Sequence, residues 1–323
     1  MKILVTGGAG FIGGHLTAAL LKRGDEVIIA DNFSTGSREN IVPVDGKMPE
    51  VHELDVAADK ESLRILVKRA DVIFHLAAAV GVELVVNDPV RTIETNIDGS
   101  SNVVKLASEY GKRLFVASTS EVYGKSSNDV FSEDDDLLIG SPVHSRWSYA
   151  CSKLMDEFYV MAYVRSAGLK GTVVRFFNTV GPGQTGRYGM VIPRFVRAAL
   201  EGKNLQVYGD GGQSRCFCHV SDVVRALLLL LENDDSIGNI YNIGSCNLIT
   251  IRELAEKVIE RAGSASQIDV IPYHIAYAAG FEDMRRRKPS TAKINALTNW
   301  RAEKSLTEII DDVIAFEKTR LSK

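Results

Sequence analysis

Short apolar segments alternate with longer amphipathic segments through the first half of the chain. The apolar segments do not alternate between apolar and polar residues as a half-exposed strand does. Such continuous apolar runs are typical of strands covered on both faces. The longer segments carry apolar residues at helical spacing; the segment 88–110, for example, has an apolar stripe at Val90, Ile93, Ile97, Val103 and Val104. We expect strands at 3–5, 26–31, 51–54, 71–75, 113–118 and 172–178, and helices at 15–24, 59–69, 88–110 and 148–167.

Strands that alternate with crossover helices predict an α/β fold, here a Rossmann-like, doubly wound parallel sheet with helices on both faces. The alternation weakens after residue 178. We therefore expect an N-terminal domain over 1–178 and a smaller C-terminal α/β substrate-binding domain over 179–323, with some later segments returning to the sheet. The expected elements of the second half are helices at 193–202, 221–232, 250–262 and 305–319 and strand segments at 205–217, 239–244 and 268–273.

Notable polar residues fall where the predicted strands end. They are Asp31, Asp55, His75, the segment 118–121 and Asn178. The carboxyl ends of parallel strands meet at one edge of a sheet, and ligands of such folds bind beyond that edge. The sequence therefore predicts a ligand site there.

Composition and charge exclude several classes of protein. The chain has 323 residues, 45% of them hydrophobic and 24% charged, and a net charge of −3, so no global attraction to nucleic acid or to an anionic membrane is expected. Its leucine run at 227–231 is far shorter than the roughly 18 apolar residues of a membrane span. Four cysteines, at 151, 216, 218 and 246, form no C-x-x-C pair. We expect a cytoplasmic protein with reduced thiols, no signal peptide and no metal site.

The N-terminal sequence MKILVTGGAGFIGG joins the first strand to the first helix through glycines. Gly8, Gly10 and Gly13 fit G-x-G-x-x-G, and Gly7 with the last two fits G-x-x-G-x-x-G. Such glycines allow a tight turn and a close approach of the backbone to a pyrophosphate, which the helix N-terminus then binds. The motif predicts a dinucleotide site, and the alternative is a turn with a purely structural role.

The second strand adds an acidic residue to this site. Asp31 follows Gly13 by 18 residues, near the distance expected for the group that binds the adenosine ribose. Its charge would repel a 2′-phosphate, so NAD is favoured over NADP. Arg38, in the following loop, keeps NADP as an alternative.

Tyr149 and Lys153 form Y-x-x-x-K within the helix expected at 148–167. At this spacing both side chains share one helix face, and a nearby ammonium lowers the pKa of a tyrosine from its usual value of about 10. Such a tyrosine can act as a general base towards a sugar or alcohol hydroxyl. The alternative is a tyrosine and a lysine with no joint role.

A hydroxyl-rich segment, Ser118-Thr119-Ser120-Glu121, ends the strand at 113–118. Hydroxyls at this edge can hydrogen-bond a substrate hydroxyl and assist its proton transfer. Alternatively, the segment is a turn in which Ser and Thr cap their own backbone. The order of glycine turn, Asp31, hydroxyl cluster and Y-x-x-x-K favours one shared site.

These motifs resemble the extended short-chain dehydrogenases, the NAD-dependent epimerases and dehydratases of nucleotide-diphosphate sugars. The resemblance covers almost the whole chain. It is carried by VTGGAGFIG (5–13), FHLAA (74–78), STSEVYG (118–124), YACSK (149–153), RFFNTVGP (175–182), VYGDGGQSRCFCHVSD (207–222) and RRRKPS (285–290).

The resemblance implies a set of site residues. It implies an NAD site at Gly7, Gly10, Phe11, Ile12, Asp31, Asn32, Ser34, Thr35, Gly36, Asp55, Val56, Leu76, Ala77, Ala78, Asn96, Ser118, Tyr149 and Lys153. It implies Thr119, Glu121, Tyr149 and Lys153 as catalytic residues, and Ser120, Asn178, Val191, Val207, Tyr208, Arg215 and Arg287 as contacts of a UDP-sugar. Relatives pair the helices that correspond to 88–110 and 148–167 across a dimer interface, so a homodimer is expected.

The resemblance also implies a reaction that begins with oxidation of the sugar at C4 by NAD. The Thr-Ser-Glu sequence at 119–121 resembles UDP-glucuronate decarboxylases and GDP-mannose 4,6-dehydratases, and 133–153 and 287–290 resemble decarboxylases. We expect decarboxylation of UDP-glucuronate to UDP-xylose, with Glu121 and Arg287 orienting the carboxylate. Differences from the decarboxylase pattern at 149–153 and 181–191 leave a UDP-sugar 4-epimerase as the alternative. A 4,6-dehydratase and a non-catalytic NAD- or sugar-binding regulator are further alternatives.

Overall fold

The computed structural model describes residues 1–81, 88–186, 190–276, 284 and 286–322. Within them, a seven-stranded sheet has the order β11-β6-β5-β4-β1-β2-β3, and every pairing is parallel. Its strands are β1 (Lys2–Thr6), β2 (Glu26–Asp31), β3 (Glu50–Glu53), β4 (Val72–His75), β5 (Arg113–Thr119), β6 (Lys170–Phe176) and β11 (Ile240–Ile243). The predicted α/β Rossmann-like fold is confirmed.

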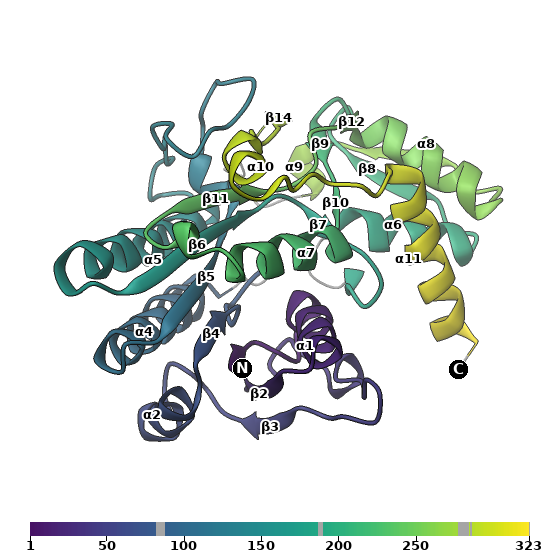
Figure 1. Ribbon diagram of the computed structural model, residues 1–323. Helices are drawn as coiled ribbons and strands as arrows, with labels where there is room; N and C mark the ends of the chain where they lie inside the picture. The colour runs from purple at the N-terminus through teal and green to yellow at the C-terminus, as the bar shows by residue number, and fades with distance from the viewer. Residues whose placement is uncertain (82–87, 187–189, 277–283, 285, 323) are drawn as a thin grey trace.

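Helices cover both faces of this sheet (Figure 1). One face carries α1 (Phe11–Arg23) and α7 (Val220–Leu231), and the other carries α2 (Lys60–Arg69), α4 (Pro89–Glu109) and α5 (Arg146–Ala167).

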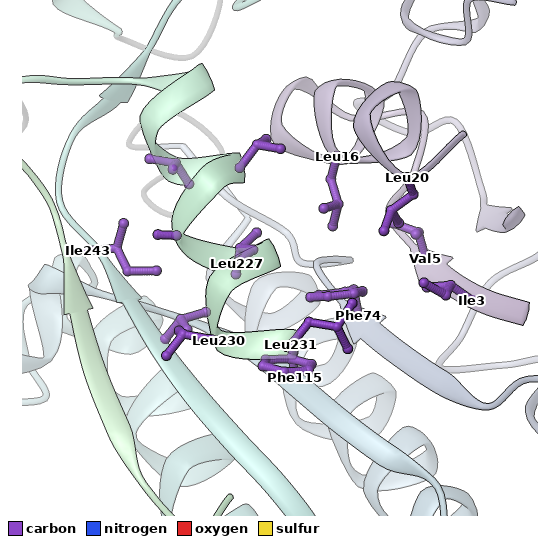
Figure 2. Close-up of a cluster of buried hydrophobic side chains, with 14 of the residues drawn as sticks. Ile3, Val5, Leu16, Leu20, Phe74, Phe115, Leu227, Leu230, Leu231 and Ile243 are labelled. Carbon is purple, nitrogen blue, oxygen red and sulfur yellow. The ribbon is translucent and has the colours of Figure 1, made fainter. Parts of the chain in front are cut away.

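The pleat of β1 divides its side chains between the two layers. Ile3 and Val5 join the buried cluster that includes Leu227 of α7, whereas Leu4 joins the cluster beneath α2 and α4. Figure 2 shows the first cluster, in which Leu16 of α1 and Leu227 of α7 lie in the same apolar layer. Because β1 is buried on both faces, its sequence has no polar alternation, which is why it reads as a continuous apolar run.

The C-terminal half packs beyond one end of the sheet around a core of its own (Figure 1). Its longer helices are α6 (Val191–Leu200), α8 (Ile251–Ala262) and α11 (Leu306–Leu321), and its shorter ones are α9 (Tyr273–Ala276) and α10 (Ala292–Thr298). Small sheets pair β7 (Thr179–Val180) with β10 (Cys218–His219), β8 (Leu205–Tyr208) with β13 (Ile268–Ile271), and β9 (Ser214–Cys216) with both β12 (Leu248–Thr250) and β14 (Arg286–Arg287). Three single-turn helices complete the described elements: η1 (Arg38–Asn40), η2 (Ser120–Tyr123) and η4 (Asp234–Ser236).

Two later segments pack against the first half. The strand β11 pairs with β6, and α7 packs on α1. The strand predicted to run to residue 178 ends at Phe176, and Asn178 has a positive φ of 35°, which turns the chain out of the sheet. No helix described by the structure is long and apolar enough to cross a membrane.

The turn between β1 and α1 is closely packed. A Cβ atom on Gly7, whose φ is +72°, would lie 2.6 Å from the Ala77 backbone nitrogen. One on Gly13 would lie 2.1 Å from the Gly7 carbonyl oxygen. No real side chain tolerates these distances, so both glycines are required for α1 to begin against the sheet edge.

This packing predicts that Gly13→Ala destabilises the fold. The added methyl group meets backbone rather than a flexible side chain, so we expect a loss of at least about 1–3 kcal/mol in the free energy of unfolding. Denaturant unfolding followed by circular dichroism measures it.

Gly99→Ala is the matched control. Its Cβ would approach only the Val56 side chain, at 3.0 Å, and alanine is favoured over glycine inside a helix by about 1 kcal/mol. Equal stability losses in the two variants would contradict the assigned role of Gly13.

Candidate active site

A cavity of about 1430 Å³ runs along the carboxyl edge of the central sheet and is lined by residues from both halves of the chain. A pocket for one drug-sized ligand usually measures roughly 300–1,000 Å³. The cavity is therefore large enough for two ligands side by side, such as a dinucleotide and a nucleotide sugar.

One end of the cavity lies at the start of α1. Gly10 occupies the N-cap position without a side-chain cap, and Phe11 and Ile12 follow it along the wall. The first amides of a helix have no partner within the helix, and they point along the axis towards its N-terminus. The site thus presents N–H donors, a positive helix end and glycines without side chains, which fits the pyrophosphate of NAD.

Asp31 lies at the end of β2, and its carboxylate is held by two backbone amides. The Ala9 nitrogen donates to Oδ2 at 2.9 Å and the Phe33 nitrogen to Oδ1 at 2.8 Å. Burial raises the pKa of Asp31, and these two hydrogen bonds oppose that rise. A carboxylate has about four lone-pair sites, so Asp31 can also accept from ribose hydroxyls.

Arg38, the residue that kept NADP as an alternative, is engaged elsewhere. Its guanidinium donates to Glu53 at 2.9 Å and lies 4.3 Å from the centre of the Phe33 ring. The cation that a 2′-phosphate would need is therefore paired with a carboxylate, which agrees with NAD as the cofactor.

The cavity brings the implied residues together with two exceptions, Asn96 and Val207. Asn96 is 1% exposed and accepts from the Ala79 nitrogen at 2.8 Å, so it supports the loop after β4 from behind the wall. Val207 is fully buried in the C-terminal core, because alternate residues of β8 point to opposite faces and its neighbour Tyr208 takes the cavity side. These two residues therefore do not line the cavity, and the direct ligand contacts implied for them stay predictions.

Tyr149 and Lys153 both line the cavity on α5, but their electrostatics differ from the expectation. Burial raises the pKa of Tyr149 above its usual range, the charges of Glu121 and Asp156 raise it further, and only a hydrogen bond with Thr119 lowers it. Lys153 donates to Asp156 Oδ2 at 2.7 Å. The expected lowering of the pKa of Tyr149 is wrong in this structure, because burial and the charges of Glu121 and Asp156 raise it instead.

Glu121 follows Thr119 at the start of η2 and faces three guanidinium groups. Arg287 Nη1 donates to Glu121 Oε1 at 2.9 Å, and Arg146 Nη2 lies 3.6 Å from the same oxygen. Burial alone would raise the pKa of Glu121, but Arg287, Arg146 and Arg215 lower it below its ordinary value.

The hydroxyl cluster serves two purposes. Thr119 Oγ1 accepts from the Glu121 nitrogen at 3.2 Å, as in the turn expected as an alternative, and the same hydroxyl hydrogen-bonds Tyr149. Ser118 donates its hydroxyl to Glu157 Oε1 at 2.5 Å. A turn capped by its own hydroxyl and a hydroxyl that can bind substrate are thus compatible interpretations of this segment.

Two of the arginines come from adjacent strands of the C-terminal half. β14 pairs with β9 so that Arg287 lies opposite Arg215. Arg285 of the same basic run, and residues 187–189 of the segment 181–191, lie outside the described residues.

Sequence reasoning missed other residues of the wall. Arg146 precedes Tyr149 by three positions on α5, so helical spacing alone could have linked the two. Arg194 lies with its guanidinium 4.3 Å from the centre of the Tyr208 ring. Gln213, Phe316 and Arg320 also line the cavity, but they come from distant segments and no local pattern marks them.

The part of the chain that the structure describes contains no cluster of His, Cys, Asp and Glu suited to a metal ion. Cys216 and Cys218 are buried on β9 and β10 as free thiols, and Cys151 and Cys246 are exposed free thiols.

Comparisons with known proteins agree with this site. The model of a family described as the NAD dependent epimerase/dehydratase family matches residues 3–244. A UDP-N-acetyl-alpha-D-glucosaminuronate decarboxylase from Bacillus cytotoxicus is 41% identical over 314 residues, 97% of this chain and 96% of that protein. UDP-glucuronic acid decarboxylase 1 from Arabidopsis thaliana is 35% identical over 324 residues, 99% of this chain and 71% of that protein.

Solved structures show the same likeness. The UDP-glucose 4-epimerase of Thermotoga maritima with UDP-glucose has a TM-score of 0.89 and 30% identity, and the match covers 99% of this chain and 100% of that one. The Thermus thermophilus UDP-glucose 4-epimerase complex with NAD has a TM-score of 0.87 and 33% identity, with 98% and 99% covered. The glycine turn, the Tyr149–Lys153 pair and the family match lead to one conclusion: the chain belongs to the NAD dependent epimerase/dehydratase family.

Proposed function

We propose that this protein is an NAD-dependent decarboxylase of a UDP-hexuronate, which converts UDP-glucuronate to UDP-xylose. The observation that carries the proposal is the group of Arg146, Arg215 and Arg287 around Glu121, beside Tyr149. Arg287 and Arg146 thus bring guanidinium groups to the sugar end of the cavity, where Glu121 already engages them. Guanidinium groups pair with carboxylates by charge-assisted hydrogen bonds, which suits a substrate carboxylate that neutral hexoses lack.

The chain's own residues account for the proton and the carboxylate. Tyr149 would accept the proton of the C4 hydroxyl as phenolate, which the positive nicotinamide ring of bound NAD would favour against the burial that raises the pKa of Tyr149. Thr119, which hydrogen-bonds that phenol, would bind the same hydroxyl. NAD, when bound, takes the hydride from C4 and later returns it. Oxidation at C4 makes the sugar a β-keto acid, whose bond from C5 to the carboxyl carbon breaks readily.

Arg287 and Arg146 have the geometry to hold the departing carboxylate. Two carboxylates side by side repel unless a cation intervenes, and Arg287 already bonds Glu121 from the cavity side. When CO2 leaves, the electron pair passes through C5 to the C4 oxygen. A proton from water is then added at C5. Tyr149 returns its proton to the C4 oxygen, and the reduced cofactor would supply the hydride to C4.

The Bacillus cytotoxicus relative favours a second substrate within the same reaction class. Its name specifies the 2-acetamido form of UDP-glucuronate. Decarboxylation of that sugar uses the same keto acid chemistry, so the two substrates are separate arms of one experiment. The 4-epimerase alternative is favoured by the structural neighbours, whose names specify UDP-glucose.

Incubation of the purified protein with UDP-glucuronate, its 2-acetamido form, UDP-glucose and dTDP-glucose tests the proposal. We expect CO2 and a UDP-pentose from one of the two hexuronates, identified by mass spectrometry and NMR. Tyr149→Phe should lower turnover by at least about 100-fold, since the proton acceptor is lost, while NAD binding persists. A product changed only at C4 would support the epimerase, loss of water would support the dehydratase, and binding without turnover would support the regulator.

Arg287→Met tests whether Arg287 acts on the substrate carboxylate or on the rest of the sugar. With UDP-glucuronate, kcat/KM should fall about ten- to hundredfold, the usual effect of losing a hydrogen bond to a charged group. Reduction of bound NAD by UDP-glucose, which has no carboxylate, should change much less. The pKa of Glu121, followed by carbon NMR, should rise because the guanidinium that lowers it is gone.

Arg301→Met, which removes an exposed cation outside the cavity, is the control for that variant. It should match the unmodified protein in both reactions. Equal losses with UDP-glucuronate and UDP-glucose in Arg287→Met would contradict a role for Arg287 at the carboxylate.

A homodimer through α4 and α5 is part of the proposal. Val90, Ile93 and Ile97 on α4 are 64%, 38% and 38% exposed, and Met155 and Phe158 on α5 are 53% and 59% exposed. Apolar residues gathered on two neighbouring helices are typical of a protein interface. A cytoplasmic location is proposed with it, supported by four free thiols, which a reducing compartment maintains.

Phe158→Asp should convert the dimer to a monomer, because it adds a charge to the buried centre of the proposed interface. Light scattering coupled to size-exclusion chromatography measures the mass. Ile65→Asp is the control, since Ile65 is also 59% exposed but lies on α2, which is not part of the proposed interface. A dimer that survives Phe158→Asp, or an unmodified chain that is monomeric, would contradict this interface.

A further inference from the structure

The ammonium of Lys153 is held in a buried ion pair that the mechanism above does not use. Its Nζ lies 2.7 Å from Asp156 Oδ2, and each side chain is 2% exposed. The two residues are three positions apart on α5, which puts them on neighbouring turns of one face. Lys153 lines the cavity and Asp156 does not, so Asp156 acts on a ligand only through Lys153.

Asp156 is fixed from the opposite side by α4. Its carboxylate hydrogen-bonds Ser100, whose hydroxyl lies 3.1 Å from Nε2 of His75. Nδ1 of His75 lies 2.7 Å from the hydroxyl of Thr6. A continuous chain of buried polar groups therefore leads from the end of β1 to the catalytic lysine, and it leaves Asp156 little freedom to move.

The charges along this chain are balanced inside the protein. Burial, followed by the charge of Lys153, lowers the pKa of His75 to about 3, so its imidazole is neutral at physiological pH. Burial raises the pKa of Asp156, and Lys153 and Ser100 oppose that rise. The nearby Glu157 adds a smaller rise, while its own carboxylate bonds Arg175 at 2.7 Å.

Three groups act on the Tyr149 phenol besides burial, and Asp156 is one of them. Glu121 on η2 and Asp156 on α5 disfavour the phenolate by their charges, and Thr119 at the end of β5 favours it by a hydrogen bond. Lys153 shares the cavity wall with Tyr149 but is neutralised by Asp156 at 2.7 Å. Removing the Asp156 charge would thus both relieve one repulsion and free the ammonium to act on the phenol.

We propose that Asp156 is a positioning residue, which holds Lys153 by this buried ion pair and so sets the pH above which Tyr149 accepts a proton. The proposal rests on the proposed function, in which Tyr149 is the base. In this proposal, a carboxylate outside the cavity controls how kcat falls at low pH.

Asp156→Asn tests it, because asparagine keeps the shape and removes the charge. We expect the acid limb of the kcat profile to move to lower pH by about one pH unit, the lower range for a single neighbouring charge. The KM for the sugar should stay within about twofold, since Asp156 does not line the cavity. Asp134→Asn, at an exposed carboxylate, is the control and should leave the limb in place.

A second readout does not need turnover. Near-ultraviolet absorbance follows formation of the Tyr149 phenolate, as the difference between a protein and its Tyr149→Phe counterpart. In Asp156→Asn this difference should develop at lower pH than in the unmodified chain. A shifted absorbance without turnover on any nucleotide sugar would uphold the charge effect and refute the proposed function instead.

An unmoved limb and an unmoved absorbance in folded Asp156→Asn would overturn the proposal. A fall in kcat at every pH, without a shift, would also overturn it, because that is the effect of a merely structural residue. If Asp156→Asn fails to fold, Ser100→Ala decides the matter. It removes a hydrogen bond that favours the Asp156 carboxylate, so it should shift the limb and the absorbance in the same direction by less, and no shift would refute the proposal.

Discussion

The packing of α1 directly against the edge of the central sheet is the constraint on which the rest of the site depends. It requires that the Gly7 carbonyl and the Gly13 α-carbon approach more closely than any side chain would allow. Because α1 starts at this point, its unpaired amides face the cavity, and Asp31 lies within hydrogen-bonding distance of the turn through the Ala9 nitrogen. The shape of the dinucleotide end of the cavity thus follows from backbone geometry. The same geometry explains why Gly7 and Gly13 are glycines.

The sugar end depends on charge instead. Glu121 is partly buried among arginines, and a carboxylate in that position is stable because the guanidinium groups compensate for lost hydration. Lys153 and Asp156, which are both buried on α5, follow the same rule, since neither would be charged alone without a large cost. In both places the charge is compensated by other groups of the protein. The amino-acid sequence itself therefore determines the local electrostatic field.

Much of the fold could be predicted from the sequence because its signals are local. The apolar strands, the glycine turn and the long helices around Pro89 and Tyr149 are each encoded within a short segment. The short helix α10 was missed, since its seven residues lack a side-chain cap and a long apolar period. The lysine–aspartate pair was not anticipated either: the spacing of three is visible in the sequence, but the burial that forces Lys153 onto Asp156 comes from α4.

Glu121 and Arg287 are 166 positions apart in sequence, and the bond between them joins a residue that follows the central sheet to a strand of the C-terminal half. Each half therefore contributes one member of this pair. Arg146 of the first half also lies 3.6 Å from Glu121, but the guanidinium that donates the hydrogen bond comes from the second half. In evolutionary terms, exchange of the second half for a foreign module would deprive Glu121 of that hydrogen bond.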